Sequence, residues 1–115
     1  NGVVALEDKT TSQKEQNDIV YSGFTKDTLE FSDNDYLYLP NDKANKNILM
    51  LYTLIYDGKE IYTSVPVEAG KQDKVELKKY FNDMGIYHIT INIKAVDENN
   101  NIYNSMNQNF AFIIK

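Results

Sequence analysis

Within the long run Ile86 to Val96, apolar and polar residues alternate one by one from Tyr87 to Ala95, and this pattern constrains the fold more than any other feature of the chain. In an extended strand, alternate side chains point to opposite faces, which a helix cannot reproduce. The expected inward set is Tyr87, Ile89, Ile91, Ile93 and Ala95, and the expected outward set is His88, Thr90, Asn92 and Lys94. The pattern therefore predicts a strand with one buried and one wet face, in a sheet that packs on one side.

Shorter runs of the same kind follow one another along the chain, separated by turn residues. The predicted strands are Ile19–Tyr21, Thr28–Phe31, Tyr36–Leu39, Asn47–Tyr56, Lys59–Ser64, Lys74–Leu77, Ile86–Val96 and Asn109–Ile114. The Asp57-Gly58 pair predicts a tight hairpin, because a type I′ turn needs positive φ at both central residues. The segment from Val75 to Phe81 has room for one helical turn. Seven or eight short strands without a long helix predict an antiparallel all-β sandwich.

The chain is expected to form one domain behind a tether. Its 115 residues suit a single hydrophobic core, which we place at residues 19–115. Residues 1–18 are mostly polar and predict a flexible N-terminal tether. Such a tether can lead to a lipid anchor, a signal sequence or another domain, or be an end left by cloning. Because the chain starts at Asn1 without a methionine or an apolar leader, we expect a processed or trimmed product.

Composition excludes several classes of function. The absence of cysteine removes disulfides, thiolate metal sites and cysteine nucleophiles, and the single histidine, His88, cannot build a multi-histidine metal centre. The net charge is −5 and every cation is a lysine, which argues against nucleic acid and anionic membranes as partners. The longest apolar run, Ile48 to Tyr56, is far shorter than the roughly twenty residues of a membrane helix. Abundant lysine and asparagine without arginine is typical of a low-GC bacterium.

The hairpin register predicts which side chains face a partner. A two-residue turn would place Leu54 opposite Ile61 and Thr53 opposite Tyr62. The core face would then carry Ile48, Met50, Tyr52, Leu54, Tyr56 and Ile61, and the other face Leu49, Leu51, Thr53, Ile55, Glu60, Tyr62 and Ser64. Burial of each leucine or isoleucine is worth about 1.5–3 kcal/mol, so this second face needs cover. Either a loop or the N-terminal segment covers it, or Leu49, Leu51, Ile55 and Tyr62 bind a protein partner or a second copy.

Tyrosine is frequent, with nine residues, and offers a second kind of binding surface. Tyr36 and Tyr38 share one face of their strand while Leu37 and Leu39 take the other. If the leucines fill the core, the two exposed rings can stack on a sugar, with Tyr62 and Tyr103 as further candidates. The alternative is that these tyrosines are ordinary strand residues.

Other chemistry has weaker signals. The spacing Asp97-x-Asn99-x-Asn101 begins like a calcium loop, but Ile102 and Gln108 occupy the positions that need glycine and glutamate. A plain turn is the better interpretation. A lysine–asparagine isopeptide bond, for instance between Lys46 and Asn109, would show as the loss of one ammonia in the intact mass. We expect no catalytic residue, no metal and no cofactor, because no serine lies in a nucleophile elbow and no phosphate loop is present.

The run Asp83-Met84-Gly85-Ile86-Tyr87-His88-Ile89 resembles the strand that carries the tyrosine corner of immunoglobulin-like domains. The stretch from Gly85 to Asn99 is similar to the penultimate strand of bacterial surface modules of the immunoglobulin-like or PKD-like type. The resemblance implies an immunoglobulin-like Greek-key sandwich in which Gly85 and Tyr87 form a structural corner. Both cysteines and the core tryptophan of antibody domains are missing. It further implies a non-catalytic, exported or surface module with a structural or protein-interaction role, carbohydrate binding being the alternative.

Overall fold

Strands make up almost all of the regular structure. The computed structural model describes residues 19–21 and 26–115. The strands are β2 (Thr28–Phe31), β3 (Leu37–Pro40), β4 (Leu49–Tyr56), β5 (Lys59–Thr63), β6 (Gln72–Val75), β7 (Gly85–Val96) and β8 (Ile102–Ile114), and one 3-10 turn, η1, covers Leu77–Lys79. The all-β prediction is confirmed. In these two ranges, no helix has the length and apolar character that crossing a bilayer requires.

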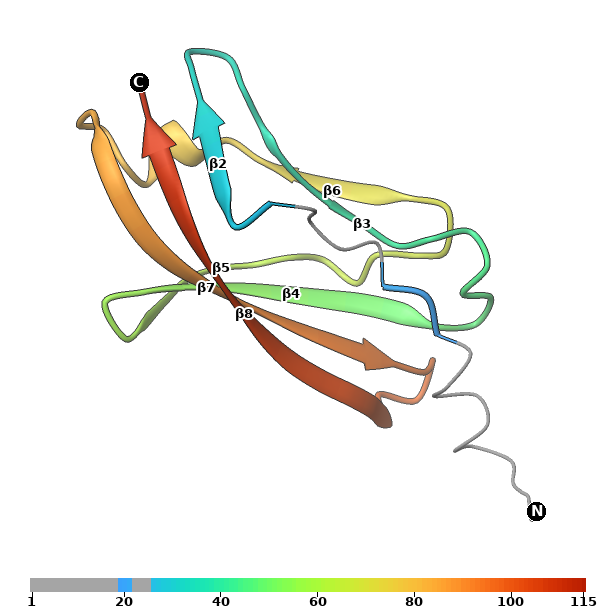
Figure 1. The fold of residues 1–115 in the computed structure, drawn as a ribbon. Helices are drawn as coiled ribbons and strands as arrows, with labels where there is room; N and C mark the ends of the chain where they lie inside the picture. The colour runs from blue at the N-terminus through green and yellow to red at the C-terminus, as the bar shows by residue number, and fades with distance from the viewer. Residues whose placement is uncertain (1–18, 22–25) are drawn as a thin grey trace.

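The strands form two sheets. The larger sheet has the order β2-β8-β7-β4-β5, in which β2 runs parallel to β8 and the other pairs are antiparallel. The smaller sheet pairs β3 with β6. Figure 1 shows β3 and β6 as a separate layer on one side of the larger sheet. The sheet is thus mixed rather than purely antiparallel, and the arrangement is that of a β-sandwich.

The core lies between the two layers and follows the predicted alternation. Along β7, Ile89, Ile91, Ile93 and Ala95 are buried, whereas His88 is exposed. The largest fully buried side chains come from both sheets and from η1: Phe112, Leu39, Met50, Leu54, Leu77, Ile89, Ile91 and Ile114. The inward set is therefore confirmed, with Tyr87 half-buried at its end.

The β4–β5 hairpin confirms the turn and corrects the register. Asp57 and Gly58 both have positive φ, 53° and 75°. Ile55 pairs with Glu60 as predicted, but a bulge follows, and Leu54 then pairs with Tyr62 instead of Ile61. The extra residue on β5 moves every later side chain to the opposite face. The predicted outward position of Tyr62 was therefore wrong, because a bulge cannot be recognised from alternation alone.

Several predicted boundaries also differ, most by one or two residues. Strand β8 begins at Ile102 instead of Asn109. Its first residues are mostly polar and indicate a loop by sequence, but they form a strand because they pair with β7. Strand β6 ends at Val75, and Leu77 opens the 3-10 turn. Residues 19–21 are not in a strand. The predicted tether, residues 1–18, lies outside the described residues.

Two asparagines fasten the start of β4 to its surroundings. The Asn41 side-chain amide donates to the carbonyls of Ile48 and Val67, both at 2.8 Å. The Asn45 amide donates to Asn41 Oδ1 at 2.8 Å and to the Val20 carbonyl at 2.7 Å, and Asn45 Oδ1 accepts from the Val20 N–H at 2.8 Å. Both asparagines are buried, and all four amide hydrogens are used. We call this group the amide clasp.

Tyrosine hydroxyls provide three further ties. Tyr52 on β4 donates to the carbonyl of Pro40 on β3, and Tyr62 on β5 donates to the carboxylate of Asp73 on β6. Both bonds join the two sheets. The third tie is a 2.7 Å bond from Tyr87 on β7 to the carbonyl of Asp83, in the turn just before the strand.

The first and last described strands also hold together. Parallel pairing aligns Thr28 with Ala111 and Phe31 with Ile114. The ladder is closed by a 2.8 Å bond from the Ala111 N–H to the Asp27 carbonyl and a 2.9 Å bond from the Lys115 N–H to the Phe31 carbonyl. Lys115 also forms an ion pair with Glu30, which lowers the pKa of that carboxyl.

Candidate functional site

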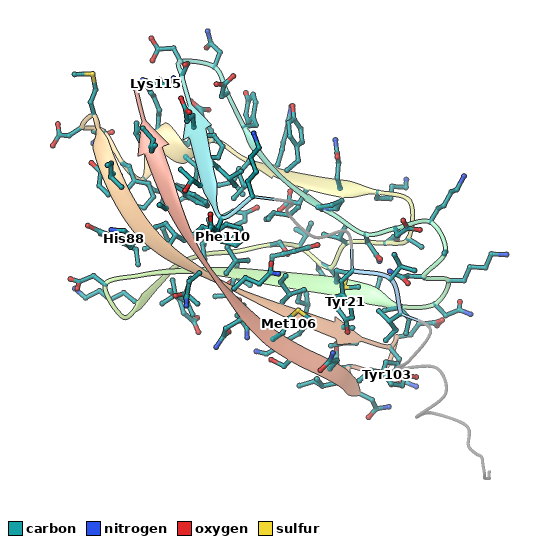
Figure 2. All side chains as sticks on the ribbon, in the orientation of Figure 1. Tyr21, His88, Tyr103, Met106, Phe110 and Lys115 are labelled. Carbon is teal, nitrogen blue, oxygen red and sulfur yellow. The ribbon has the colours of Figure 1, made fainter. Side chains whose placement is uncertain are left out.

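The side of the larger sheet that faces away from β3 and β6 is the broadest candidate surface. Strand register fixes its members, which we call the outer face: Thr28 and Glu30 on β2; Leu49, Leu51, Thr53 and Ile55 on β4; Glu60 on β5; Ile86, His88, Thr90, Asn92 and Lys94 on β7; and Ser105, Asn107, Asn109, Ala111 and Ile113 on β8. In Figure 2, His88 projects from β7 on the side opposite to Phe110, which enters the core.

Charge is scarce at the centre of the outer face. Among the described residues on its three central strands β4, β7 and β8, Lys94 is the only lysine, aspartate or glutamate, and the two carboxylates Glu30 and Glu60 lie on the flanking strands β2 and β5. Three candidate residues for partner binding, Leu49, Leu51 and Ile55, lie there together, each half-buried within the sheet. Ile86, at the start of β7, is 63% exposed. A charge-poor surface of this kind is typical of the centre of a protein interface.

Polar side chains on β7 and β8 hold each other in place across the middle of the outer face. The Thr90 hydroxyl donates to Asn109 Oδ1 at 2.8 Å, and the Asn92 amide donates to Asn107 Oδ1 at 2.9 Å. The Asn92 amide also reaches Ser105 Oγ at 3.2 Å. These contacts fix the rotamers of exposed residues, so a partner meets a surface that is already ordered.

Tyr62, the fourth candidate for partner binding, is not part of this surface. The bulge turns it to the core side, where its ring packs against the buried cluster and its hydroxyl reaches Asp73. Desolvation by burial, with the Asp73 hydrogen bond and charge beside it, raises the pKa of the Tyr62 hydroxyl. Its expected place opposite Thr53, on the face that carries Leu51, was wrong because of the bulge.

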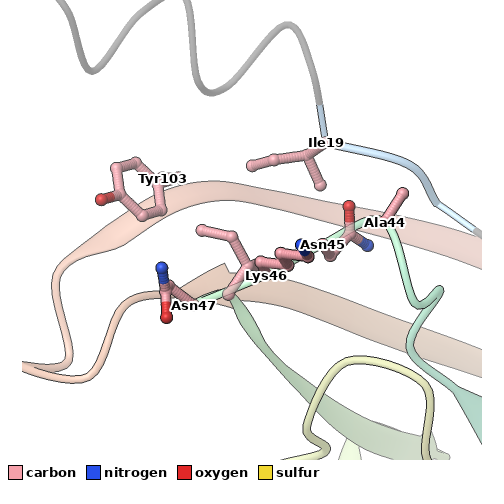
Figure 3. A pocket seen from close by; sticks show the side chains of 7 residues that line it. Ile19, Ala44, Asn45, Lys46, Asn47 and Tyr103 are labelled. Carbon is pink, nitrogen blue, oxygen red and sulfur yellow. The ribbon is translucent and has the colours of Figure 1, made fainter.

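The candidate sugar platform has its two rings on one face of β3, as expected, but the rings are not parallel. Tyr36 and Tyr38 share a face, with ring centroids 6.4 Å apart, but their planes are tilted by 50°. The Lys74 ammonium lies 4.6 Å from the Tyr36 centroid and occupies that ring. Tyr38 is 46% exposed and is the more accessible of the pair. Tyr103 lies apart from this pair, on β8, in the pocket of Figure 3.

The residues of the predicted corner come together at the start of β7. Gly85 opens the strand, and Tyr87 packs against Phe81 and Tyr56, with centroid distances of 4.4 and 5.8 Å. The Tyr56 and Phe81 rings are themselves 5.2 Å apart. Together with the Tyr87 hydroxyl bond to Asp83, these contacts fix the entry of the chain into β7. We call the three rings the aromatic cluster.

In the acidic turns, the aspartate side chains form hydrogen bonds and ion pairs within the protein. Asp97 Oδ1 accepts from the N–H groups of Asn99 and Asn101 at 2.8 and 2.9 Å. The side-chain hydrogen bond from Asn101 is the main cause of the lowered pKa of Asp97. In the turn at Asn34, Asp33 pairs with Lys78, which lowers the pKa of the Asp33 carboxyl. The described residues contain no group of three or more His, Asp or Glu side chains that could hold a metal ion.

Two hollows of similar size open on the surface. One, of about 300 Å³, lies beneath Ile19 and is lined by Asn45, Lys46 and Tyr103, as Figure 3 shows. The other, of about 290 Å³, lies on the outer face over Ala111, beside His88 and Asn109. Lys46 and Asn109, weighed above as an isopeptide pair, thus line different hollows. Asn109 is six residues from Tyr103 along β8, about 20 Å in an extended strand.

Sequence reasoning missed the amide clasp and the exposed residue Ile86. Asn41 and Asn45 lie in a loop where asparagine usually signals a turn, so nothing in the sequence marked them as buried. Ile86 could have been found, because it has the same parity as His88 in the alternation of β7. The hydrogen bond from Tyr52 to the Pro40 carbonyl was also missed. In the structure, burial raises the pKa of the Tyr52 hydroxyl to about 12.

Comparison with known proteins adds no relative: no family model, curated protein or solved structure matches this chain.

Proposed function

We propose that this chain is a non-catalytic immunoglobulin-like module, exported to the surface or exterior of a low-GC bacterium, that binds a protein partner through the outer face. The observation that carries the binding role is the charge-poor, ordered surface built on β4, β7 and β8. Depletion of charge distinguishes interface centres from ordinary surface better than hydrophobicity alone.

Strand connectivity supports the Greek-key part of the proposal. The chain passes from β3 to the hairpin β4–β5 in the other sheet, returns to pair β6 with β3, and then inserts β7 between β4 and β8. Immunoglobulin-like domains place strands B and E in one sheet and C, F and G in the other. In that scheme β7 corresponds to strand F, and Tyr87 near its start bonds back to Asp83, as a corner tyrosine does.

Site-specific crosslinking tests the binding role. A photoreactive residue placed at Leu51 in the full chain, in cells that express it, should give a discrete crosslinked product, whereas one placed at Tyr38 should not. The mass of the product distinguishes a second copy from another protein. Equal products from both positions, or none from Leu51, would contradict the proposal.

A charge reversal of the surface gives an independent test. If the partner is a second copy, sedimentation velocity between about 5 and 500 μM should show association that Leu51→Glu abolishes and Tyr38→Glu preserves. Both side chains lie on sheet surfaces, so neither change creates a buried charge in the core.

Carbohydrate binding at Tyr36 and Tyr38 is the second candidate. It is supported by the neighbouring rings and by the exposure of Tyr38. A glycan array should show binding by the wild-type chain and its loss in Tyr38→Ala, while Tyr36→Ala has the smaller effect because Lys74 already covers that ring. Silence on the array would remove this candidate.

A further inference from the structure

The hollow over Ala111 arises from the size of one side chain. Register aligns His88 on β7, Ala111 on β8 and Thr28 on β2 in one row across the outer face. Neighbouring strands are about 4.8 Å apart, so His88 and Thr28 stand about 10 Å from each other with only a methyl group between them. The result is a depression of about 290 Å³.

The walls of the hollow carry both donors and acceptors of hydrogen bonds. Asp27 and Thr28 form one side, His88 forms the other, and the Thr90–Asn109 pair closes the end. Thr90 donates its hydroxyl hydrogen to Asn109 Oδ1, a bond that does not use the Asn109 amide hydrogens. Among the described residues that line the hollow, Asp27 is the only acidic one and none is a lysine.

These features select a class of ligand. A phosphate or carboxylate would meet the Asp27 carboxylate without a compensating cation, so an anion is disfavoured. A metal ion would find one carboxylate and one imidazole, fewer ligands than it needs. A neutral polyol matches the mixture, because each hydroxyl both donates and accepts, and the Ala111 methyl can contact the carbon side of a ring.

We propose that the hollow over Ala111 binds one neutral sugar residue, held by hydrogen bonds to Asp27, Thr28, His88 and Asn109. Its volume is at the small end of ligand sites, which fits a single ring. The site is distinct from Tyr36 and Tyr38, which lie on the other sheet, and it does not depend on protein binding at Leu51.

The test is a titration followed by NMR. Glucose, galactose, mannose and N-acetylglucosamine are added separately, up to about 50 mM, to isotopically labelled full chain, since single sugars bind weakly. At least one should cause saturable shifts of the His88 ring, the Asn109 side-chain amide and the Ala111 methyl. No saturable shift with any of the four would overturn the proposal.

Two variants locate the binding. Ala111→Leu fills the hollow and should weaken binding by about tenfold or more, whereas Ser105→Ala, on the same strand and face, should leave it unchanged. His88→Ala removes an exposed side chain without disturbing the core and should also weaken binding, which keeps the test valid if Ala111→Leu folds poorly. Shifts that map to Tyr38 and persist in both hollow variants would assign the sugar to the other sheet and overturn this site.

Discussion

The two ends of β4 are held in different ways. At its start, the amide clasp joins three segments of chain, at Val20, residues 41–48 and Val67, through buried and part-buried hydrogen bonds that share the two amide groups. At its end, the aromatic cluster holds the chain mainly by ring packing, with one hydroxyl bond at the edge. Packing contacts are many and individually weak, whereas buried hydrogen bonds are few and costly to leave unmade. Removal of one amide from the clasp should therefore lower the free energy of unfolding greatly, whereas removal of one group from the aromatic cluster should lower it only a little.

The largest effect is expected from Asn41→Leu. This change removes the side-chain donor from the carbonyls of Ile48 and Val67, the second of which keeps only the Met50 N–H, and removes the acceptor of the Asn45 amide, so it should lower the free energy of unfolding by roughly 2–5 kcal/mol. Urea denaturation measures it, with Asn82→Leu, the same substitution at an exposed position, as the control. A loss below about 1 kcal/mol would show that the clasp is not cooperative.

The burial of Tyr52 should make the free energy of unfolding depend on pH above pH 10. Because its folded pKa is raised from 10.0 to about 12, its contribution to stability is complete below pH 10 and is lost as the pH rises through 12. The free energy of unfolding should fall over that window, and less steeply in Tyr52→Phe. An ultraviolet titration in which every tyrosine ionises near pH 10 in the folded state would contradict this.

A smaller effect is expected from Tyr87→Phe. The ring and its contacts with Phe81 remain, and only the bond to the Asp83 carbonyl is lost. The free energy of unfolding should fall by about 0.5–1.5 kcal/mol, measured by urea denaturation. A loss as large as that of Asn41→Leu would mean that the hydroxyl bond, and not the packing, holds this end.

The smallest effect is expected from Ile86→Thr. Ile86 is adjacent to Tyr87 but points to the outer face and is 63% exposed, so the change should stay within about 0.5 kcal/mol. Comparing the thermal unfolding of this variant with that of Tyr87→Phe shows whether the loss of stability depends on burial or on position along the chain. A loss above that of Tyr87→Phe would contradict the comparison.

Alternation predicted the core well because it depends only on local geometry. The buried residues of β7 and the Asp57-Gly58 turn could both be read from neighbouring residues. The position of Tyr62 could not, since a one-residue bulge depends on which strand it meets. The amide clasp was equally hidden, because its partners Val20 and Val67 are more than twenty residues away in sequence.

The candidate site was predicted only in part. Leu49, Leu51 and Ile55 do share one surface, since their spacing of two and four residues fixes it. The polar half of the outer face was not predicted. Much of it comes from the first part of β8, where asparagine and serine do not indicate a strand. Those residues are in a strand because β7 offers them partners, which is a tertiary effect.

The parallel pairing of β2 with β8 also determines how the domain would resist mechanical tension. If residue 28 and residue 115 are pulled in opposite directions, the load runs along both strands and falls on all the bonds of this ladder together. The bonds must then break at once instead of unzipping in turn. A module joined to its neighbours at these two points would be a stiff link.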